Sequence, residues 1–178
     1  MSAAGQPLKV GVIGVGALGK HHARLYAENP TAVLVGVHDV DSVTAAAVAG
    51  QYGVTAFATV KELAAACDAL SIAVPAHRHH EVAVPLLRQG RHLLIEKPIA
   101  TSVKDAEEMV RLARRHRVVL AIGHVERYNP VMAFFDRMQE KIRFIEAQRL
   151  APYPPERPGL HRRGTETSVI LDLMIHDL

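Results

Sequence analysis

A glycine-rich turn near the N-terminus constrains the fold of this 178-residue chain more than any other feature. Residues 8–14 form an apolar run that leads into the pattern G-x-G-x-x-G, after which the sequence takes on a helical pattern. In such a turn the first glycine permits a sharp bend, the second leaves room for a pyrophosphate, and the third lets the helix pack against the strand. The helix N-terminus then offers N–H groups and partial positive charge to a phosphate. The residues of this predicted phosphate-binding turn are Gly14, Gly16, Ala17, Leu18 and Gly19.

An acidic residue follows at the distance that a dinucleotide site requires. Asp39 stands 20 positions after Gly19, at the end of a second apolar run, 32–38. Its carboxylate can accept hydrogen bonds from the hydroxyls of an adenosine ribose, and it would repel a 2′-phosphate. Since Val40 and Asp41 come next rather than an arginine, the pattern favours NAD over NADP as the cofactor. An ordinary glycine-rich turn between a strand and a helix is the alternative.

Apolar runs alternate with helical patterns through the first two thirds of the chain. Hydrophobic residues make up 49% of the sequence and aromatic residues only 4%, so we expect a core of Ala, Val, Leu and Ile, which suits a parallel sheet between helices. The alternation predicts an α/β fold, a Rossmann doubly wound parallel sheet with right-handed crossovers. The predicted strands are 8–14, 32–38, 69–74, 92–95 and 118–123, and the predicted helices are 17–28, 41–52, 60–66, 78–89 and 102–116.

The alternating pattern ends near Gly123, where we place a domain boundary. We expect residues 1–124 to form the dinucleotide-binding domain and residues 125–178 to form the incomplete start of an α+β substrate domain. The second stretch contains a helical pattern at 129–140, a strand pattern at 142–150, a proline-rich loop and a final helical pattern. These elements are too few to close a core by themselves. The exposed strand would be a sheet edge open to pairing, so we expect a homo-oligomer.

Composition argues against several other classes of function. A net charge of +3 does not favour nucleic-acid binding, although a basic surplus at 141–163 fits either a solvated surface or attraction to an anionic substrate. No apolar run reaches the roughly 18 residues of a membrane span. We expect no signal peptide, because a strand pattern begins within the first ten positions. The lone cysteine, Cys67, cannot form an internal disulfide, and we expect a buried, inert thiol in a cytoplasmic protein.

Polar side chains follow two of the predicted strands. Lys97, in Glu96-Lys97-Pro98, comes directly after 92–95, at the sheet edge where parallel sheets bind ligands. Its ammonium could hold a substrate hydroxyl and stabilise a developing alkoxide, although a surface lysine after a strand is the ordinary interpretation. His79 follows the strand pattern that ends at Val74-Pro75, and we expect it to line the cofactor or substrate cleft. Because no cysteine or carboxylate set accompanies the neighbouring histidines, we expect no metal ion.

A second polar pair lies in the final helical pattern. Asp172 and His176 stand four residues apart, which places both on one face of a helix. The carboxylate can orient the imidazole, and the imidazole can transfer a proton near neutral pH. A simple contact on a helix surface is the alternative.

Together these motifs resemble the Gfo/Idh/MocA family of NAD(P)-dependent oxidoreductases, which act mostly on sugars, inositols and nucleotide sugars. The resemblance covers the whole chain and includes the segment 123–130. It implies hydride transfer between a substrate carbinol carbon and nicotinamide. His176 would take or give the hydroxyl proton, Lys97 would polarise the same oxygen, and Asp172 would steady the site. The residues that the resemblance adds to the NAD site are Val74, Pro75, His79, Glu96 and Lys97.

Segment 123–130 and the proline-rich loop look like a sub-group related to the UDP-N-acetylglucosamine 3-dehydrogenases. In that sub-group Arg157, Arg162 and Arg163 would suit a substrate diphosphate. Arg127 and Asn129 could contact the substrate, but for Asn129 we favour capping of the following helix. Because family members are usually longer, we expect this chain to be a fragment or a truncated protein. Two functions stay open: an NAD-dependent dehydrogenase of sugar or nucleotide-sugar hydroxyl groups, and a non-catalytic NAD-binding module.

Overall fold

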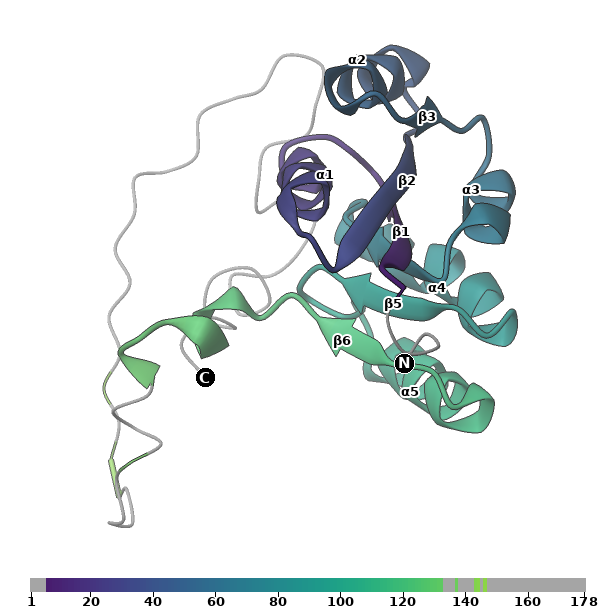
Figure 1. Cartoon of the computed structure of the whole chain (residues 1–178). Helices are drawn as coiled ribbons and strands as arrows, with labels where there is room; N and C mark the ends of the chain where they lie inside the picture. The colour runs from purple at the N-terminus through teal and green to yellow at the C-terminus, as the bar shows by residue number, and fades with distance from the viewer. Residues whose placement is uncertain (1–5, 133–136, 138–142, 145, 147–178) are drawn as a thin grey trace. The chain divides into compact units, whose positions relative to one another are not determined.

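A parallel sheet with helices on both faces forms the part of the chain that carries the predicted site (Figure 1). The computed structural model describes residues 6–132, 137, 143, 144 and 146. The chain divides into two units, Met1–Ile122 and Gly123–Leu178, of which the first contains the sheet. Its strands are β1 (Leu8–Ile13), β2 (Ala32–His38), β3 (Thr55–Ala56), β4 (Ala69–Ile72), β5 (His92–Ile95) and β6 (Leu120–Ile122). Its helices are α1 (Gly19–Glu28), α2 (Ser42–Tyr52), α3 (Val60–Ala66), α4 (His79–Arg88) and α5 (Val103–His116).

The strand order reverses at the centre of the sheet. The order is β3-β2-β1-β4-β5-β6, so the chain builds outward from β1 in one direction and then from β4 in the other. All pairings are parallel, as the Rossmann prediction requires, and the crevice beyond the carboxyl ends of β1 and β4 is the ligand-binding place of such sheets. Ile13 pairs with Ile72, and Ile72 pairs with Ile95. This register places the residues that follow these three isoleucines at one edge of the sheet.

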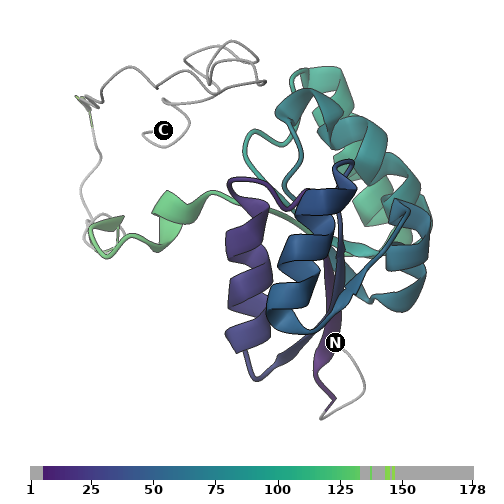
Figure 2. The ribbon, with the colours of Figure 1, turned by 90° about the horizontal axis from the view of Figure 1, so that it is seen from above.

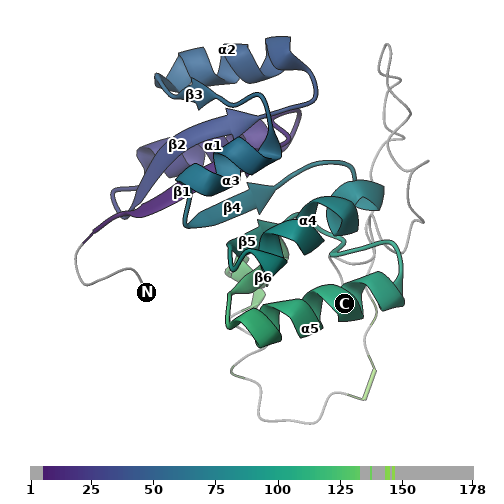
Figure 3. The same cartoon turned by 90° about the vertical axis from the view of Figure 1, so that its right-hand side faces the viewer.

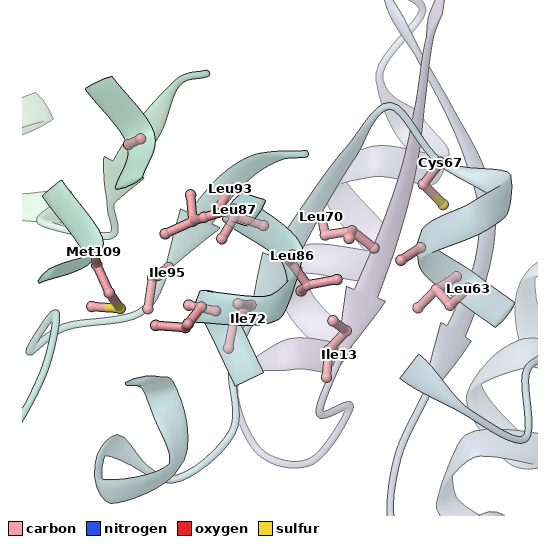
Figure 4. Close-up of a cluster of buried hydrophobic side chains, with 14 of the residues drawn as sticks. Ile13, Leu63, Cys67, Leu70, Ile72, Leu86, Leu87, Leu93, Ile95 and Met109 are labelled. Carbon is pink, nitrogen blue, oxygen red and sulfur yellow. The ribbon is translucent and has the colours of Figure 1, made fainter. Parts of the chain in front are cut away.

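Two apolar clusters pack the helices against the two faces of the sheet. Successive strand residues point to opposite faces, so Val12 joins the cluster under α1 and α2 while Ile13 joins the larger cluster under α3, α4 and α5. Figure 2 and Figure 3 show these two helical layers, with the sheet between them. Figure 4 shows the larger cluster, in which Leu86 and Leu87 of α4 and Met109 of α5 meet the strand side chains. Because both faces are covered, the central strands are mostly apolar.

The ends of the helices follow from their capping residues. Ser102 accepts a hydrogen bond from the Asp105 N–H (3.1 Å) at the start of α5. Thr59 and Glu62 form a reciprocal capping box at the start of α3. Gly53 closes α2 with a φ of 64°, a left-handed conformation that glycine adopts without strain.

The observed elements differ from the predicted ones at a few ends. β4 stops at Ile72 rather than at residue 74, and β6 begins at Leu120 rather than at residue 118. Strand β3 was not predicted, because two exposed residues, Thr55 and Ala56, show no hydrophobic periodicity. More than half of the residues in the patterns at 129–140 and 142–150 fall outside the described residues, and the final helical pattern does so completely.

Cys67 lies at the end of α3, where its side chain is buried (2% exposed), as expected. Gly11 of β1 leaves room for the thiol, since a Cβ there would lie 2.9 Å from the Cys67 Sγ. Burial raises the pKa of the thiol to about 11, against the smaller opposing influence of the nearby Arg91 charge. The folded chain therefore holds this thiol in its neutral, unreactive form.

We expect Cys67 to resist alkylation by iodoacetamide at about pH 8 in the folded chain and to react readily in urea, because only the thiolate is nucleophilic. At any pH below the ordinary thiol pKa, the contribution of the buried neutral thiol to the free energy of unfolding is complete. This contribution is lost as the pH rises through the folded pKa of about 11. Mass spectrometry of the alkylated fraction over time measures the effect. Equal rates in buffer and in urea would contradict it.

Candidate functional site

The glycine turn connects β1 to α1 with almost no spare room at two of its three glycines. Gly14 adopts a φ of +81°, and its N–H donates to the His38 carbonyl (2.8 Å). A Cβ on Gly14 would lie 2.9 Å from the backbone of Ala73, and one on Gly19 would overlap the Gly14 carbonyl oxygen. A Cβ on Gly16 would meet nothing within 4 Å. The turn and the close helix packing thus require Gly14 and Gly19, whereas the backbone at Gly16 faces open space.

The start of α1 is open to solvent. Gly16, Ala17 and Leu18 are exposed, and Leu18 at the N-cap position has no polar side chain with which to cap the helix. In contrast, α2 begins at a capping carboxylate, since Asp41 accepts a hydrogen bond from the Val43 N–H (3.0 Å). The first N–H groups of α1, together with the helix dipole, therefore suit an anionic group such as a pyrophosphate.

Asp39 connects the turn after β2 to the glycine turn. Its Oδ2 accepts a hydrogen bond from the Val15 N–H (2.7 Å), and its Oδ1 accepts one from the Asp41 N–H (3.0 Å). These two bonds fix the plane of the half-buried carboxylate. Each oxygen keeps a further lone pair that could accept a bond from a ribose hydroxyl. Sequence reasoning predicted the acid but not its contact with the glycine turn.

His79 lies beneath the loops that follow β4 and β5. The side chain is buried (1% exposed), its Nδ1 lies 2.8 Å from the Pro98 carbonyl oxygen, and its Nε2 lies 2.9 Å from the Val74 carbonyl oxygen. Carbonyl oxygens only accept, so the single N–H of a neutral ring donates to one of these two oxygens. The imidazole thus joins the Val74-Pro75 loop to the loop that contains Lys97. Direct contact between its side chain and a cofactor stays a prediction, because both nitrogens have partners inside the protein.

Lys97 lies at the same sheet edge as the glycine turn. The Glu96 N–H donates to the Ile72 carbonyl (2.9 Å), as the Ala73 N–H donates to the Ile13 carbonyl (2.9 Å), so the three strand ends are in register. Lys97 is half-buried, its N–H donates to Glu96 Oε2 (3.3 Å), and its peptide bond to Pro98 is cis. The structure thus brings Val74, Pro75, Glu96 and Lys97 to the edge where the glycine turn opens.

A buried row of hydrogen-bonded polar side chains beneath this edge was not predicted. His22 Nε2 lies 2.8 Å from Glu96 Oε1, and His22 Nδ1 lies 3.1 Å from Ser71 Oγ. The hydroxyls of Ser71 and Tyr26 lie 2.7 Å apart. The sequence does contain a signal for these contacts. His22 and Tyr26 stand four residues apart on one face of α1, and Ser71 interrupts an apolar strand.

Contacts within this row of polar side chains and with Lys97 determine the charge of Glu96. Burial by itself would raise the pKa of the carboxyl, but the hydrogen bond and charge of His22, with the N–H and charge of Lys97, outweigh it and lower that pKa. Burial raises the pKa of Tyr26, although its hydrogen bond to Ser71 opposes the change. At neutral pH the residue next to Lys97 is therefore a carboxylate.

Several predicted residues lie outside the described part of the chain: Asp172, His176, Arg157, Arg162 and Arg163. Asn129 is described, and its Oδ1 accepts a hydrogen bond from the Val131 N–H (3.1 Å), as a capping side chain does.

Among the described residues, no group of three or more His, Cys, Asp or Glu side chains is placed to hold a metal ion. In the same part of the chain, no helix combines the length and apolarity that crossing a membrane requires.

Comparison with known proteins agrees with this geometry. The model of an oxidoreductase family with an NAD-binding Rossmann fold matches residues 8–124. UDP-N-acetylglucosamine 3-dehydrogenase of Acidithiobacillus ferrooxidans is 40% identical over 172 residues, which are 96% of this chain and 52% of that enzyme. A solved structure of that enzyme is 39% identical, with a TM-score of 0.86, and the match covers 96% of this chain and 54% of the other.

A second solved structure adds a bound cofactor to the comparison. GenD2 from gentamicin A biosynthesis, in complex with NAD, is 30% identical with a TM-score of 0.70 over 75% of this chain and 39% of the other. The chain spans about half or less of the length of the curated relatives that it matches. The family match over residues 8–124 includes the glycine turn, Asp39 and Lys97 of this chain.

Proposed function

Because the chain belongs to the Gfo/Idh/MocA family of oxidoreductases and has its NAD-binding Rossmann fold, we propose that it is the cofactor-binding part of a dehydrogenase. The enzyme would act on a hydroxyl-bearing carbon of a sugar or nucleotide sugar. One observation carries the proposal: the register of β1, β4 and β5 brings the glycine turn, the Val74-Pro75 loop and Lys97 to one sheet edge. A cofactor bound at the turn would then lie beside a cationic side chain.

The proposed mechanism assigns a separate task to each group at this edge. NAD, when bound, supplies the hydride acceptor. The N–H groups at the start of α1 would hold its pyrophosphate, and Asp39 would accept bonds from the adenosine ribose hydroxyls. Gly16 would let the pyrophosphate approach the backbone. The Lys97 ammonium would donate to the substrate oxygen and stabilise negative charge that develops there.

The remaining assignments concern the second unit. We propose a dinucleotide-binding domain at 1–124 and the start of a substrate domain at 125–178. His176 would exchange the hydroxyl proton, and Asp172 would orient it. The similarity to a UDP-N-acetylglucosamine 3-dehydrogenase supports a nucleotide-sugar substrate, for which Arg157, Arg162 and Arg163 would bind the diphosphate. A cytoplasmic homo-oligomer completes the proposal.

Titration of the chain with NADH, followed by cofactor fluorescence, tests the cofactor assignment. We expect Asp39→Asn to weaken NADH binding by about ten- to a hundredfold, because a hydrogen bond to a charged group contributes about 1.5–3 kcal/mol. NADPH should bind the unmodified chain more weakly than NADH, and this difference should narrow in the variant, since the repelling carboxylate is gone. Asp41→Asn keeps the helix cap and is the matched control, with affinity expected to change by less than about twofold.

One outcome would decide against the proposal, and another against its alternative. A chain that binds neither NADH nor NADPH would contradict the cofactor assignment. The second candidate is a non-catalytic NAD-binding module, and turnover of any sugar, inositol or nucleotide sugar would rule it out.

A further inference from the structure

A continuous line of hydrogen bonds runs beneath the sheet edge from α1 to the residue before Lys97. Tyr26 and His22 come from α1, Ser71 from the centre of β4, and Glu96 from the end of β5. Ser71 is fully buried, and the side chains of His22 and Glu96 are only 15% and 12% exposed. Water is largely excluded from these contacts, so each is electrostatically stronger than it would be at the surface.

Glu96 is held at both of its oxygens. His22 Nε2 contacts Oε1 at 2.8 Å, while the Lys97 N–H donates to Oε2 at 3.3 Å. The carboxylate therefore lies directly between the imidazole and the backbone of Lys97. A change in the charge of the imidazole alters the carboxylate that accepts the Lys97 N–H bond.

The hydroxyl of Ser71 allows His22 to change charge without losing a partner. With a neutral ring, Nε2–H donates to Glu96 and Nδ1 accepts from the Ser71 hydroxyl. With a charged ring, Nδ1–H donates to Ser71, whose own proton can turn toward Tyr26. The groups facing the ring are thus Glu96, Ser71 and Tyr26, and Lys97 is the next charge beyond the carboxylate.

We propose that His22 and Glu96 are positioning residues for Lys97, and that protonation of His22 is transmitted through the Glu96 carboxylate to the backbone of Lys97. The importance of this contact for catalysis rests on the proposed function, in which Lys97 contacts the substrate oxygen. Because His22 lies on the helix whose N-terminus holds the pyrophosphate, the pair also joins the cofactor helix to the lysine. The coupling itself is a property of the chain without cofactor.

Nuclear magnetic resonance of the ¹⁵N-labelled chain, over a pH range that includes the transition of the His22 ring signals, tests the inference. We expect the Lys97 amide signal to shift in one step, with the same midpoint as the His22 ring signals. His22→Gln should abolish this step and speed hydrogen exchange at the Lys97 amide by about tenfold. His21→Gln is the matched control, because His21 is the exposed neighbour on α1, and it should keep the step.

A second variant tests the inference independently if the His22→Gln chain does not fold. Glu96→Gln keeps an oxygen for the Lys97 N–H but removes the charge, and it should also abolish the step. An unmodified chain without the step, or a folded His22→Gln chain that retains it, would overturn the inference. The measurement needs no cofactor, so failure of NADH to bind would reject the proposed function and leave this result standing.

Discussion

Gly19→Ala is expected to destabilise the chain by more than about 4 kcal/mol or to prevent folding, because overpacking of this severity cannot be relieved by a side-chain rotation. A methyl group at this position would overlap the Gly14 carbonyl oxygen and would also approach the Ala73 side chain to 3.3 Å. Either α1 or the turn after β1 must move, and both belong to the proposed NAD site. Urea unfolding followed by circular dichroism measures the loss.

Two other glycines serve as matched controls. Gly16→Ala should leave stability within about 1 kcal/mol of the unmodified chain, because a Cβ there meets nothing within 4 Å, yet it should abolish NADH binding by occupying the place of the pyrophosphate. Gly50→Ala, inside α2 and also without a neighbour within 4 Å, should stabilise the chain by about 0.5–1 kcal/mol. A Gly19→Ala chain as stable as the Gly50→Ala chain would show that the turn is not tightly packed.

His79→Ala is expected to lower the free energy of unfolding by about 3–5 kcal/mol. The change leaves a cavity at the position of the buried ring and removes the imidazole contacts to two carbonyl oxygens, those of Val74 and Pro98. Urea unfolding again measures the effect. His77→Ala is the matched control, since His77 is exposed two residues away, and it should change stability by less than about 0.5 kcal/mol.

A conservative variant separates the hydrogen bonds of His79 from its volume. His79→Gln fills much of the cavity and can still donate to one carbonyl oxygen. We therefore expect its free energy of unfolding to lie between those of His79→Ala and His77→Ala. If His79→Ala proved as mild as His77→Ala, the imidazole would not hold the two loops together.

Local sequence signals predicted the elements well where one feature decides the outcome. The predicted helices 41–52 and 102–116 agree with α2 and α5 to within one residue, because the capping that ends a helix depends on neighbouring residues alone. The glycine spacing and the acid at the end of β2 likewise predicted both the turn and the position of Asp39. In contrast, β3 consists of two exposed residues whose strand character comes only from pairing with β2.

The polar contacts of the site could be predicted less well, because they join residues far apart in the sequence. The His22–Glu96 contact spans 74 positions, and it exists only because β1, β4 and β5 end in register. His79 was predicted as a cleft residue from its place after a strand. Its burial depends on the loop after β5, which no pattern near residue 79 reveals.

The open start of α1 has a consequence for how the chain responds to its surroundings. A capping side chain at Leu18 would add about 1 kcal/mol to the stability of the helix, and this chain forgoes that contribution. A bound dinucleotide phosphate would take the position of the missing cap, and the free energy of unfolding would then increase with the logarithm of the cofactor concentration. The apparent stability of the chain would therefore depend on how much cofactor is present when it is measured.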